Sequence, residues 1–483
     1  MNLIRNSDAI SILPVEGRRP ITVIGNEAII STFDQKCLEQ AVNTAKAPGI
    51  DKVVVNPDAH VGYGCPVGSV VTSRSHIYPG PVGPDIKCSM SLLQTDIPAA
   101  EIQDLRVRRA LIDAIEERVP TGANNRIAKK GHRIDPSDLV EAACFGVDFG
   151  VLDRIGVPDK WHERCEDSRH GAEEDLFNRY HRVNGALGGR LKEKLSQLGS
   201  YGGGNHFGEC CITDVVESAT GDHFGLKHGC VSFLSHCGSR GFGFALANNQ
   251  FKTLEQHFKK WNIPLPGGDR HLVYAPLDTK EGHNYLLDMY LGANFATVNH
   301  LLINQLVLEA FQEVLPGTKG ELVYFISHNI AREEVIDGKT TWVHRKGATR
   351  AYPAGHFSLH DTQYFATGHP ILLPGNPRDG SMVMVANEGA AASCFSINHG
   401  AGRAMGRKDA SRRLVQREVD QQLKDADVIS NCRTYPIDES PDAYKPFKEV
   451  INSVIAADLA RPVAILRAKF VIKDGDTSLK GAA

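Results

Sequence analysis

VVVNPDAHVGYGCPVGSVV, residues 53–71, and GPVGPDIKCSMSLL, residues 80–93, decide the fold class of this chain. Both stretches contain short β-branched runs that glycine and proline interrupt, a pattern typical of strands that end in turns. Asp58, His60, Asp85 and Cys88 lie at or near those turns, where functional side chains are often found. The two stretches therefore predict a sheet whose strand ends carry polar groups.

The sequence on either side mixes strand and helix patterns. Upstream, we expect a hairpin with strands near residues 21–24 and 28–30, joined at Gly25 and Asn26, and then an amphipathic helix from Asp34. Charged helical patterns dominate a downstream segment from about residue 99 to residue 198. Further helices are expected near Phe242–Phe258 and Tyr285–Val314, and further strands near Leu322–Ile326, Thr341–His344 and Met382–Ala386.

These patterns predict an α/β fold in the mixed α+β sense. Internal repeats, low-complexity tracts and linkers rich in proline or serine are absent from the sequence. We therefore expect one large domain over residues 1–483, with central β-sheets flanked by helices. Because the candidate site segments are scattered from residue 58 to residue 403, we also expect a single composite site.

The composition is that of a globular protein: 42% of the 483 residues are hydrophobic and 23% are charged. No apolar run approaches the ~18 residues of a membrane span, and the amino terminus lacks the apolar core of a signal peptide, so we expect a cytoplasmic protein without a membrane partner. Eleven cysteines without small-scaffold spacing favour reduced thiols or metal ligation. With a net charge of −3, any surface for a polyanion must be local.

Six segments place a histidine or a cysteine beside glycine or another small residue: 58–60, 85–88, 205–206, 236–240, 328–329 and 399–403. A lone histidine is more often a hydrogen-bonded core residue, and a buried cysteine is usually inert. Together, however, imidazole, thiolate and carboxylate groups suit a borderline transition metal. Because no C-x-x-C pair is present, an open catalytic metal site is favoured over a zinc finger.

Two charged segments allow alternative interpretations. His162, Cys165 and His170 in residues 161–182 resemble metal ligands. Exposed polar helix faces have the same composition, and we favour an exposed helix over a metal site here. Residues 344–350 contain the densest basic cluster, which either binds RNA phosphates or forms a solvated loop.

Seven segments, in chain order, resemble the signatures of the RtcB RNA-splicing ligases. They are PDAHVGYG (57–64), VGPDIKCS (82–89), GGGNHFGE (202–209), SHCGSRG (235–241), SHNIAREE (327–334), VHRKGATRAYPAG (343–355) and NHGAGRAMGR (398–407). The resemblance extends from about residue 20 to residue 473 and so covers nearly the whole chain.

The resemblance implies a Mn(II)- and GTP-dependent RNA ligase that joins a 3′-phosphate or 2′,3′-cyclic phosphate end to a 5′-hydroxyl end, in RNA repair or tRNA splicing. Cys88 would bridge two Mn(II) ions. His236 and His328 would complete the protein ligands of one ion, and Asp85 and His206 those of the other. His399 would attack the α-phosphate of GTP and form a covalent histidine–GMP intermediate. An archease-like activator is a possible partner.

The resemblance also assigns two binding groups. The expected nucleotide-binding residues are Asn205, Asn329, Pro374, Gly375, Ser381, Gly400, Ala401, Gly402, Arg403 and Lys473. The expected RNA- or phosphate-binding residues are Asp58, Glu209, Arg240, Arg345, Lys346 and Arg350.

The chain departs from the family pattern at two places. Residues 374–381 read PGNPRDGS where most members have Ser-Met-Gly after Pro-Gly, which bears on the preference for GTP over ATP. Lys87, Ser89 and Ser91 replace the usual Asn, Gly and Arg around Cys88, so we expect a cation beside the anionic ligands. Two other functions remain open: a metal-dependent RNA-end phosphoesterase and a non-catalytic paralogue that binds RNA ends. His399 beside a complete ligand set favours the ligase.

Overall fold

The β-branched stretch at residues 53–71 lies in the first of two large, mainly antiparallel sheets. A computed structural model describes residues 3–122 and 128–475. The first sheet has the order β1-β2-β3-β4-β5-β13-β12, and only β3 and β4 pair in parallel. Its strands are β1 (Ile4–Arg5), β2 (Ile10–Leu13), β3 (Ile21–Ile24), β4 (Ile50–His60), β5 (Val67–Ser73), β12 (Asn329–Ile336) and β13 (Lys339–Lys346).

Alternation along β4 explains why both of its faces are buried. Val53 and Val55 share a hydrophobic core with Leu38 of α2 (Gln35–Lys46). Val54 points the other way and shares a core with Val454 of α13 (Phe447–Ala456). Because successive strand residues face opposite sides, a continuous VVV run indicates a strand covered on both faces.

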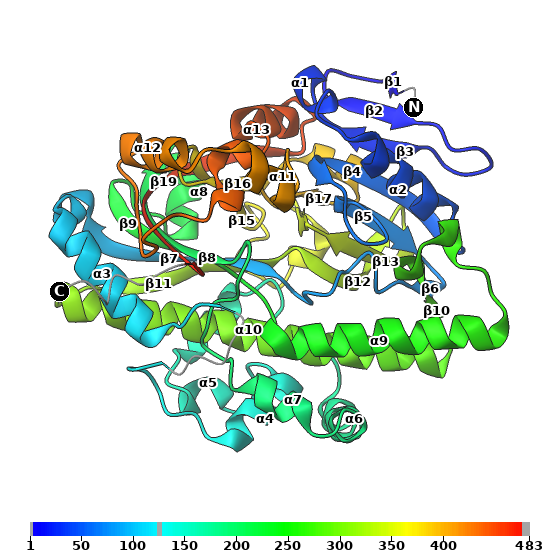
Figure 1. Ribbon diagram of the computed structural model, residues 1–483, viewed down its shortest axis with the longest axis horizontal. Helices are drawn as coiled ribbons and strands as arrows, with labels where there is room; N and C mark the ends of the chain where they lie inside the picture. The colour runs from blue at the N-terminus through cyan, green and yellow to red at the C-terminus, as the bar shows by residue number, and fades with distance from the viewer. Residues whose placement is uncertain (1–2, 123–127, 476–483) are drawn as a thin grey trace.

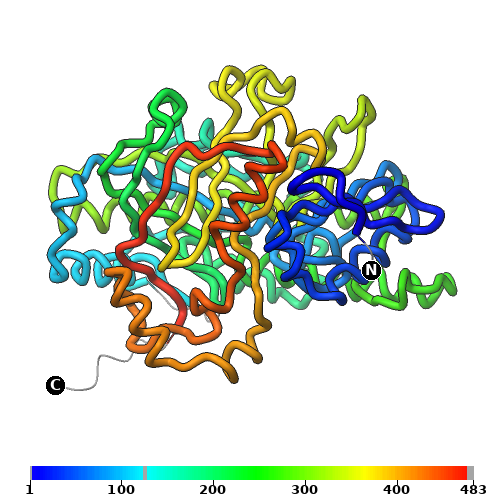
Figure 2. Tube along the Cα trace, turned by 90° about the horizontal axis from the view of Figure 1, so that it is seen from above, coloured from blue at the N-terminus to red at the C-terminus, as the bar shows by residue number. Residues whose placement is uncertain are grey.

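The second sheet has the order β11-β7-β9-β8-β19-β16-β15, with β18 paired in parallel to β19. Figure 2 shows the carboxyl-terminal strand β19, in red, between green and yellow strands of this sheet, while the blue amino-terminal strands lie at one side of the molecule. Its strands are β7 (Ser89–Pro98), β8 (Phe207–Val215), β9 (Cys230–Cys237), β11 (Gly320–Ser327), β15 (Ile371–Asn376), β16 (Gly380–Ala386), β18 (Ile429–Ser430) and β19 (Ala460–Lys473).

Two short ribbons complete the strands. β6 (His76–Ile77) pairs with β10 (Ala275–Pro276), and β14 (Ala348–Arg350) pairs with β17 (Ser396–Asn398). The second ribbon matters most for the site, because His399 directly follows β17.

Long helices cover one face of the sheets. In Figure 1, α9 and α10 run side by side beneath them, and α4 to α7 lie beyond these two helices. Together with α2 and α13, the helices are α1 (Glu27–Ile30), α3 (Leu105–Arg118), α4 (Pro136–Phe145), α5 (Val151–Arg154), α6 (Glu173–Ala186), α7 (Arg190–Leu195), α8 (Ser218–Phe224), α9 (Arg240–Trp261), α10 (Lys280–Val314), α11 (Arg407–Arg413) and α12 (Gln416–Asp425).

The predicted mixed α/β fold, with sheets flanked by helices, is confirmed. The helices expected at 242–258 and 285–314 are α9 and α10, and the strands expected at 322–326, 341–344 and 382–386 are β11, β13 and β16. The helical segment predicted at 99–198 holds α3 to α7, with residues 123–127 outside the described part of the chain. No helix of the described residues is long and apolar enough to cross a membrane.

The predicted hairpin at Gly25 and Asn26 is wrong. Residues 28–30 belong to helix α1, because the side chain of Asn26 caps the helix by accepting a hydrogen bond from the backbone N–H of Ile29 at 3.0 Å. The expected helix from Asp34 is confirmed as α2, whose cap is the Asp34 carboxylate. A short cap signal therefore outweighed the strand propensity of three apolar residues.

Candidate active site

Four strand ends of the second sheet bring the predicted metal ligands to one place. Cys88 precedes β7, His206 precedes β8, His236 lies near the end of β9 and His328 follows β11. The antiparallel register pairs Ser89 with both Cys237 and Ser327, and Phe207 with His236, so these ends coincide. Sheet register therefore turns residues from distant parts of the sequence into neighbours.

The ligand atoms are close enough to share metal ions. Cys88 Sγ lies 3.4 Å from His206 Nε2 and 3.2 Å from His236 Nε2. His236 Nε2 lies 3.3 Å from His328 Nε2, and His206 Nε2 lies 2.9 Å from Asp85 Oδ2. Cys88, His206 and His236 are buried and place their ligand atoms within 4.8 Å of one another. The structure thus brings together all five predicted ligands.

The protonation states in this cluster fit a metal ion. His236 Nδ1 donates to the backbone carbonyl of Asn205 at 3.1 Å, which leaves the Nε2 lone pair aimed at the thiol and at His328. Burial and neighbouring imidazoles hold the pKa values of His236 and His328 well below the usual range, so both rings are neutral. Burial and Asp85 raise the pKa of the Cys88 thiol. A bound cation would stabilise the imidazole lone pairs that converge beside the Cys88 thiol, and it would also favour the thiolate form of Cys88.

A histidine supported by a buried carboxylate stands beside this cluster. Asp58 is fully buried, and its Oδ2 accepts hydrogen bonds from His399 Nδ1 at 2.6 Å and from the His399 backbone N–H at 3.1 Å. The His399 ring centroid lies 4.8 Å from that of His328. With Nδ1 bonded to Asp58, His399 keeps Nε2 free as a nucleophile.

Backbone contacts explain how His399 reaches the cluster. Ala348 at the start of β14 pairs with Asn398, and its N–H donates to the His328 carbonyl at 3.1 Å. Behind Asp58, Lys445 Nζ donates to the carbonyls of Pro57 and Ala59 at 2.9 and 2.8 Å. No sequence motif pointed to Lys445 as a support for this end of β4.

A cavity of about 400 Å³ joins the cluster, the histidine and most of the predicted binding residues. The predicted residues that line it are Asp85, Cys88, Asn205, Glu209, His236, His328, Asn329, Lys346, Pro374, Gly375, Ser381, His399, Gly400, Ala401, Gly402, Arg403 and Lys473. The polar lining residues not assigned by sequence are His60, Tyr63, Asn376, Arg407, Tyr435, Glu439 and Tyr444. Tyr63 and Arg407 lie inside quoted motifs and could have been found, whereas Tyr435, Glu439 and Tyr444 carry no motif.

Glu439 organises the cations at one end of the cavity. Its carboxylate lies 3.1 Å from Lys473 Nζ, 3.3 Å from Arg403 Nη1 and 2.6 Å from Arg407 Nη1. Nearby, Glu209 Oε1 accepts from Ser381 Oγ at 3.2 Å, and burial raises the pKa of Glu209 to about 7. This end offers three cations and a carboxyl group that is partly protonated near neutral pH.

The divergent loop at 374–381 forms the turn of the β15–β16 hairpin. Asn376 Oδ1 accepts from the backbone N–H groups of Arg378 and Asp379 at 3.1 and 3.0 Å. The Arg378 side chain is held by Asp379 and, at 2.7 Å, by Asp442. Neither Arg378 nor Asp379 lines the cavity. The added charges therefore lie outside the cavity that Pro374 and Gly375 help to form.

Three of the predicted RNA-binding arginines are buried outside this cavity. Arg345 and Arg350 lie on strands and are buried, so the solvated-loop interpretation is wrong. Neither lines the cavity beside His399, because Arg345 is bound by Glu334 at 2.9 Å and Arg350 by Glu166 at 2.8 Å. Arg240 is also buried away from the cavity and donates to Ser200 Oγ and the Gly122 carbonyl. Of the basic cluster, only Lys346 reaches the cavity wall.

Lys87 does not point toward the metal ligands, contrary to expectation. Its amine donates to the Asp167 carbonyl at 2.9 Å and Thr297 Oγ1 at 2.7 Å, and lies 3.0 Å from His170 Nε2. His170 is therefore a buried partner of Lys87. His162 and Cys165 contact local backbone carbonyls, and none of the three belongs to a metal-type cluster of the described residues.

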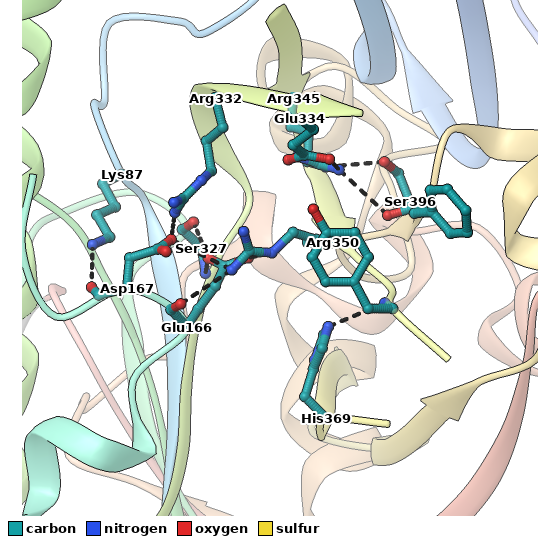
Figure 3. A network of polar contacts seen from close by, with 12 residues as sticks. Lys87, Glu166, Asp167, Ser327, Arg332, Glu334, Arg345, Arg350, His369 and Ser396 are labelled. Carbon is teal, nitrogen blue, oxygen red and sulfur yellow. Dashed lines mark hydrogen bonds and ion pairs between the residues drawn. The ribbon is translucent and has the colours of Figure 1, made fainter. Parts of the chain in front are cut away.

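Figure 3 shows that a buried ionic network ties the helical segment to the strands that carry the ligands. Glu166 Oε2 accepts from Ser327, which precedes His328, through N–H at 3.0 Å and Oγ–H at 2.5 Å. Asp167 pairs with Arg332 and lies 3.4 Å from Arg350. The network therefore holds residues adjacent to two of the predicted metal ligands, Cys88 and His328.

Glu166→Ala should destabilise the protein strongly. The substitution leaves buried Arg350 without its main counter-charge, which costs about 3–5 kcal/mol. Urea unfolding measures this loss in the free energy of unfolding.

Burial raises the pKa of Glu166, but Arg350 and Arg332 outweigh it and lower that pKa to about 2. The stabilisation should thus be complete above about pH 4.5 and lost as the pH falls toward 2. The control is Glu313→Ala, which removes an exposed partner of Arg118 and should change the midpoint of urea unfolding little. If both variants lowered that midpoint equally, the prediction would be contradicted.

The fold and the cavity are those of a mixed α/β enzyme with a composite site, in which a His/Cys cluster adjoins a histidine that a carboxylate supports. The sequence matches the family described as tRNA-splicing ligase RtcB over residues 40–474. The chain therefore belongs to the RtcB family and is an RNA ligase by class.

Relatives from archaea and bacteria agree with this assignment. The chain is 34% identical to the tRNA-splicing ligase RtcB of Archaeoglobus fulgidus, with 92% of each chain covered. It is 34% identical to that of Thermococcus kodakarensis, over 94% of this chain and 95% of the relative. It is also 34% identical to the RNA-splicing ligase RtcB of Mycobacterium tuberculosis, over 88% of this chain and 98% of the relative.

Proposed function

We propose that this protein is a Mn(II)- and GTP-dependent RNA ligase that joins 3′-phosphate or 2′,3′-cyclic phosphate ends to 5′-hydroxyl ends. Membership of the tRNA-splicing ligase family supports an RNA substrate in tRNA splicing or RNA repair. The observation that carries the proposal is the Asp58–His399 hydrogen bond at 2.6 Å, beside the His/Cys cluster. An archease-like activator remains a candidate partner.

His399 would perform the first step. Its Nε2 attacks the α-phosphorus of GTP, a P–N bond forms, and the P–O bond to pyrophosphate breaks. Asp58 holds the Nδ1 proton and stabilises the positive charge that the ring acquires. Arg403 and Lys473 line the same cavity and can bind phosphate oxygens, and Asn205 and Asn329 can donate amide hydrogens.

Two manganese ions would be held by the five clustered ligands. Cys88 lies centrally and would contribute to both ligand sets, with His236 and His328 in one set and Asp85 and His206 in the other. When bound, the ions would neutralise charge that develops on the reacting phosphates. Thiolate and imidazole ligands by themselves suit zinc better than manganese. The choice of manganese is therefore part of the proposal.

The remaining steps transfer the nucleotide to RNA. The RNA 3′-phosphate displaces His399 from GMP, so the P–N bond breaks and a phosphoanhydride forms. The 5′-hydroxyl oxygen of the second RNA then attacks the 3′-phosphorus, the phosphodiester forms, and GMP leaves. A 2′,3′-cyclic phosphate must first be opened by water to the 3′-phosphate. His399 returns to the neutral state that Asp58 supports.

The alternatives make weaker use of the site. A phosphoesterase needs the metal ligands but no nucleophilic histidine, and a protein that only binds RNA ends needs neither. The pairing of a buried carboxylate with His399 favours covalent transfer over both.

The adduct itself is the direct test. Incubation with Mn(II) and GTP labelled at the α-phosphate should give a labelled protein band on a denaturing gel, and the band should be lost in acid because phosphoramidates are acid-labile. ATP in place of GTP measures the nucleotide preference of the divergent loop. A metal-loaded protein that forms no band with either nucleotide would contradict the ligase proposal.

A further inference from the structure

A second cavity, of about 220 Å³, continues from the first. The two cavities share Tyr63, Gly83, Pro84 and Lys346 as lining residues. Pro84 precedes the metal-type ligand Asp85 in the chain. A path therefore leads from the His/Cys cluster along the Tyr63 loop to the surface of helix α9.

One face of α9 forms the far wall of this groove. The groove is lined on this side by Phe244, Asn248, Phe251, Lys252 and Glu255. The last four lie 4, 7, 8 and 11 residues after Phe244, which is the spacing of residues on a single helix face. Phe244 is 53% exposed and Tyr63 is 64% exposed, although both are large apolar side chains. Such exposure beside a functional cavity indicates a surface that another molecule covers.

Aromatic rings stand on both sides of the groove. The Tyr63 ring lies 5.2 Å from that of His271, and His271 lies 5.8 Å from Phe251 in an edge arrangement. Nucleic-acid bases stack on such rings with little sequence preference, because every base has a π face.

The charge of the groove is positive in a protein whose net charge is −3. Lys252, Arg270 and Lys346 line it against a single carboxylate, Glu255, which lies 3.5 Å from Arg270. Lys252 makes no ion pair within residues 3–122 and 128–475. Cations beside aromatic rings suit a single-stranded polynucleotide better than an apolar peptide.

The groove is held in shape by close backbone contacts. Lys346 Nζ donates to the carbonyls of Tyr63 and Cys65. A side chain at Gly64 or at Gly80 would collide with the backbone carbonyl of His271. The Tyr63 loop and the His271 turn are therefore locked together, and the groove is formed before a ligand arrives.

We propose that this groove binds the single-stranded RNA nucleotides next to the end that is joined, a proposal that rests on the ligase function above. Bases stack on Phe244 and Tyr63, while Lys252 and Arg270 contact backbone phosphates. The groove recognises the strand without reading its sequence.

Binding of two fluorescent pentanucleotides, one with a 3′-phosphate and one with a 5′-hydroxyl, tests the groove and identifies the strand. Phe244→Leu should weaken binding of at least one of them about tenfold, which corresponds to about 1.4 kcal/mol, because leucine cannot stack on a base. Phe244→Trp should retain the affinity. Lys252→Gln should reduce the dependence of log K on log salt by about 0.7, the value for one phosphate on a single strand.

Phe177→Leu on α6 is the matched control, because Phe177 is an exposed phenylalanine outside both cavities. Wild-type affinity of Phe244→Leu for both oligonucleotides, together with an unchanged salt slope in Lys252→Gln, would overturn the proposal. Binding is measured without ligation, so a wild-type protein that forms no nucleotide adduct would count against the ligase function, and the groove would be judged separately.

Discussion

Replacing His399 by alanine is expected to abolish both the covalent nucleotide adduct and RNA ligation. His399 Nε2 is the proposed nucleophile, which the Asp58 hydrogen bond leaves free, and alanine offers no atom that can take the nucleotide. Loss of a covalent nucleophile reduces turnover on the order of 10⁴-fold or more. Labelled GTP on a denaturing gel measures the first step, and ligation of a broken RNA measures the complete reaction.

Asp58→Asn distinguishes support of the histidine from a merely structural role. Asparagine retains the shape of the side chain but can hold the ring in the other tautomer, with Nε2 protonated, which in a comparable histidine–carboxylate pair costs about 10⁴-fold. We expect slow adduct formation in a folded protein. His223→Ala, on the exposed side of α8, is the histidine control and should label as wild type. A normal adduct in His399→Ala would assign the nucleophile to another residue.

Cys88→Ala is expected to remove bound manganese and ligation together while the protein stays folded. Cys88 Sγ lies 3.4 Å from His206 Nε2 and 3.2 Å from His236 Nε2, so its loss separates the two proposed ligand sets. Even supporting residues of metal sites change affinity 10–100-fold, and a bridging ligand should exceed that range. Elemental analysis after gel filtration measures the metal content, and thermal unfolding measures the fold.

Cys210→Ala provides the matched control for this variant. Cys210 is also a buried cysteine of the second sheet, within β8, but its side chain packs in the hydrophobic core with Phe233. Its alanine variant should keep both metal and activity. Full manganese content in Cys88→Ala would remove Cys88 from the metal site.

The misassigned residues show where local patterns fail. Arg345 and Arg350 look like an exposed basic cluster in sequence, because four cationic or ionisable side chains occur within seven residues. Their actual environment depends on Glu334 and Glu166, and Glu166 lies 184 residues from Arg350 along the chain. Lys87 was misplaced for the same reason, since its partner Thr297 is 210 residues away.

The sequence by itself determined the family, the mixed α/β class and the main helices and strands, and it predicted the set of side chains that the fold brings together around Cys88 and His399. These features are encoded in periodicity and in short ordered motifs, which are properties of neighbouring residues. Only the tertiary structure decided that Asp58 supports His399 across 341 residues, that Lys445 supports the end of β4 around Asp58, and that Tyr63 and Phe244 form one groove. Such contacts arise from the register of strands such as β14 and β17, which depends on the packing of the whole sheet and not on local propensity.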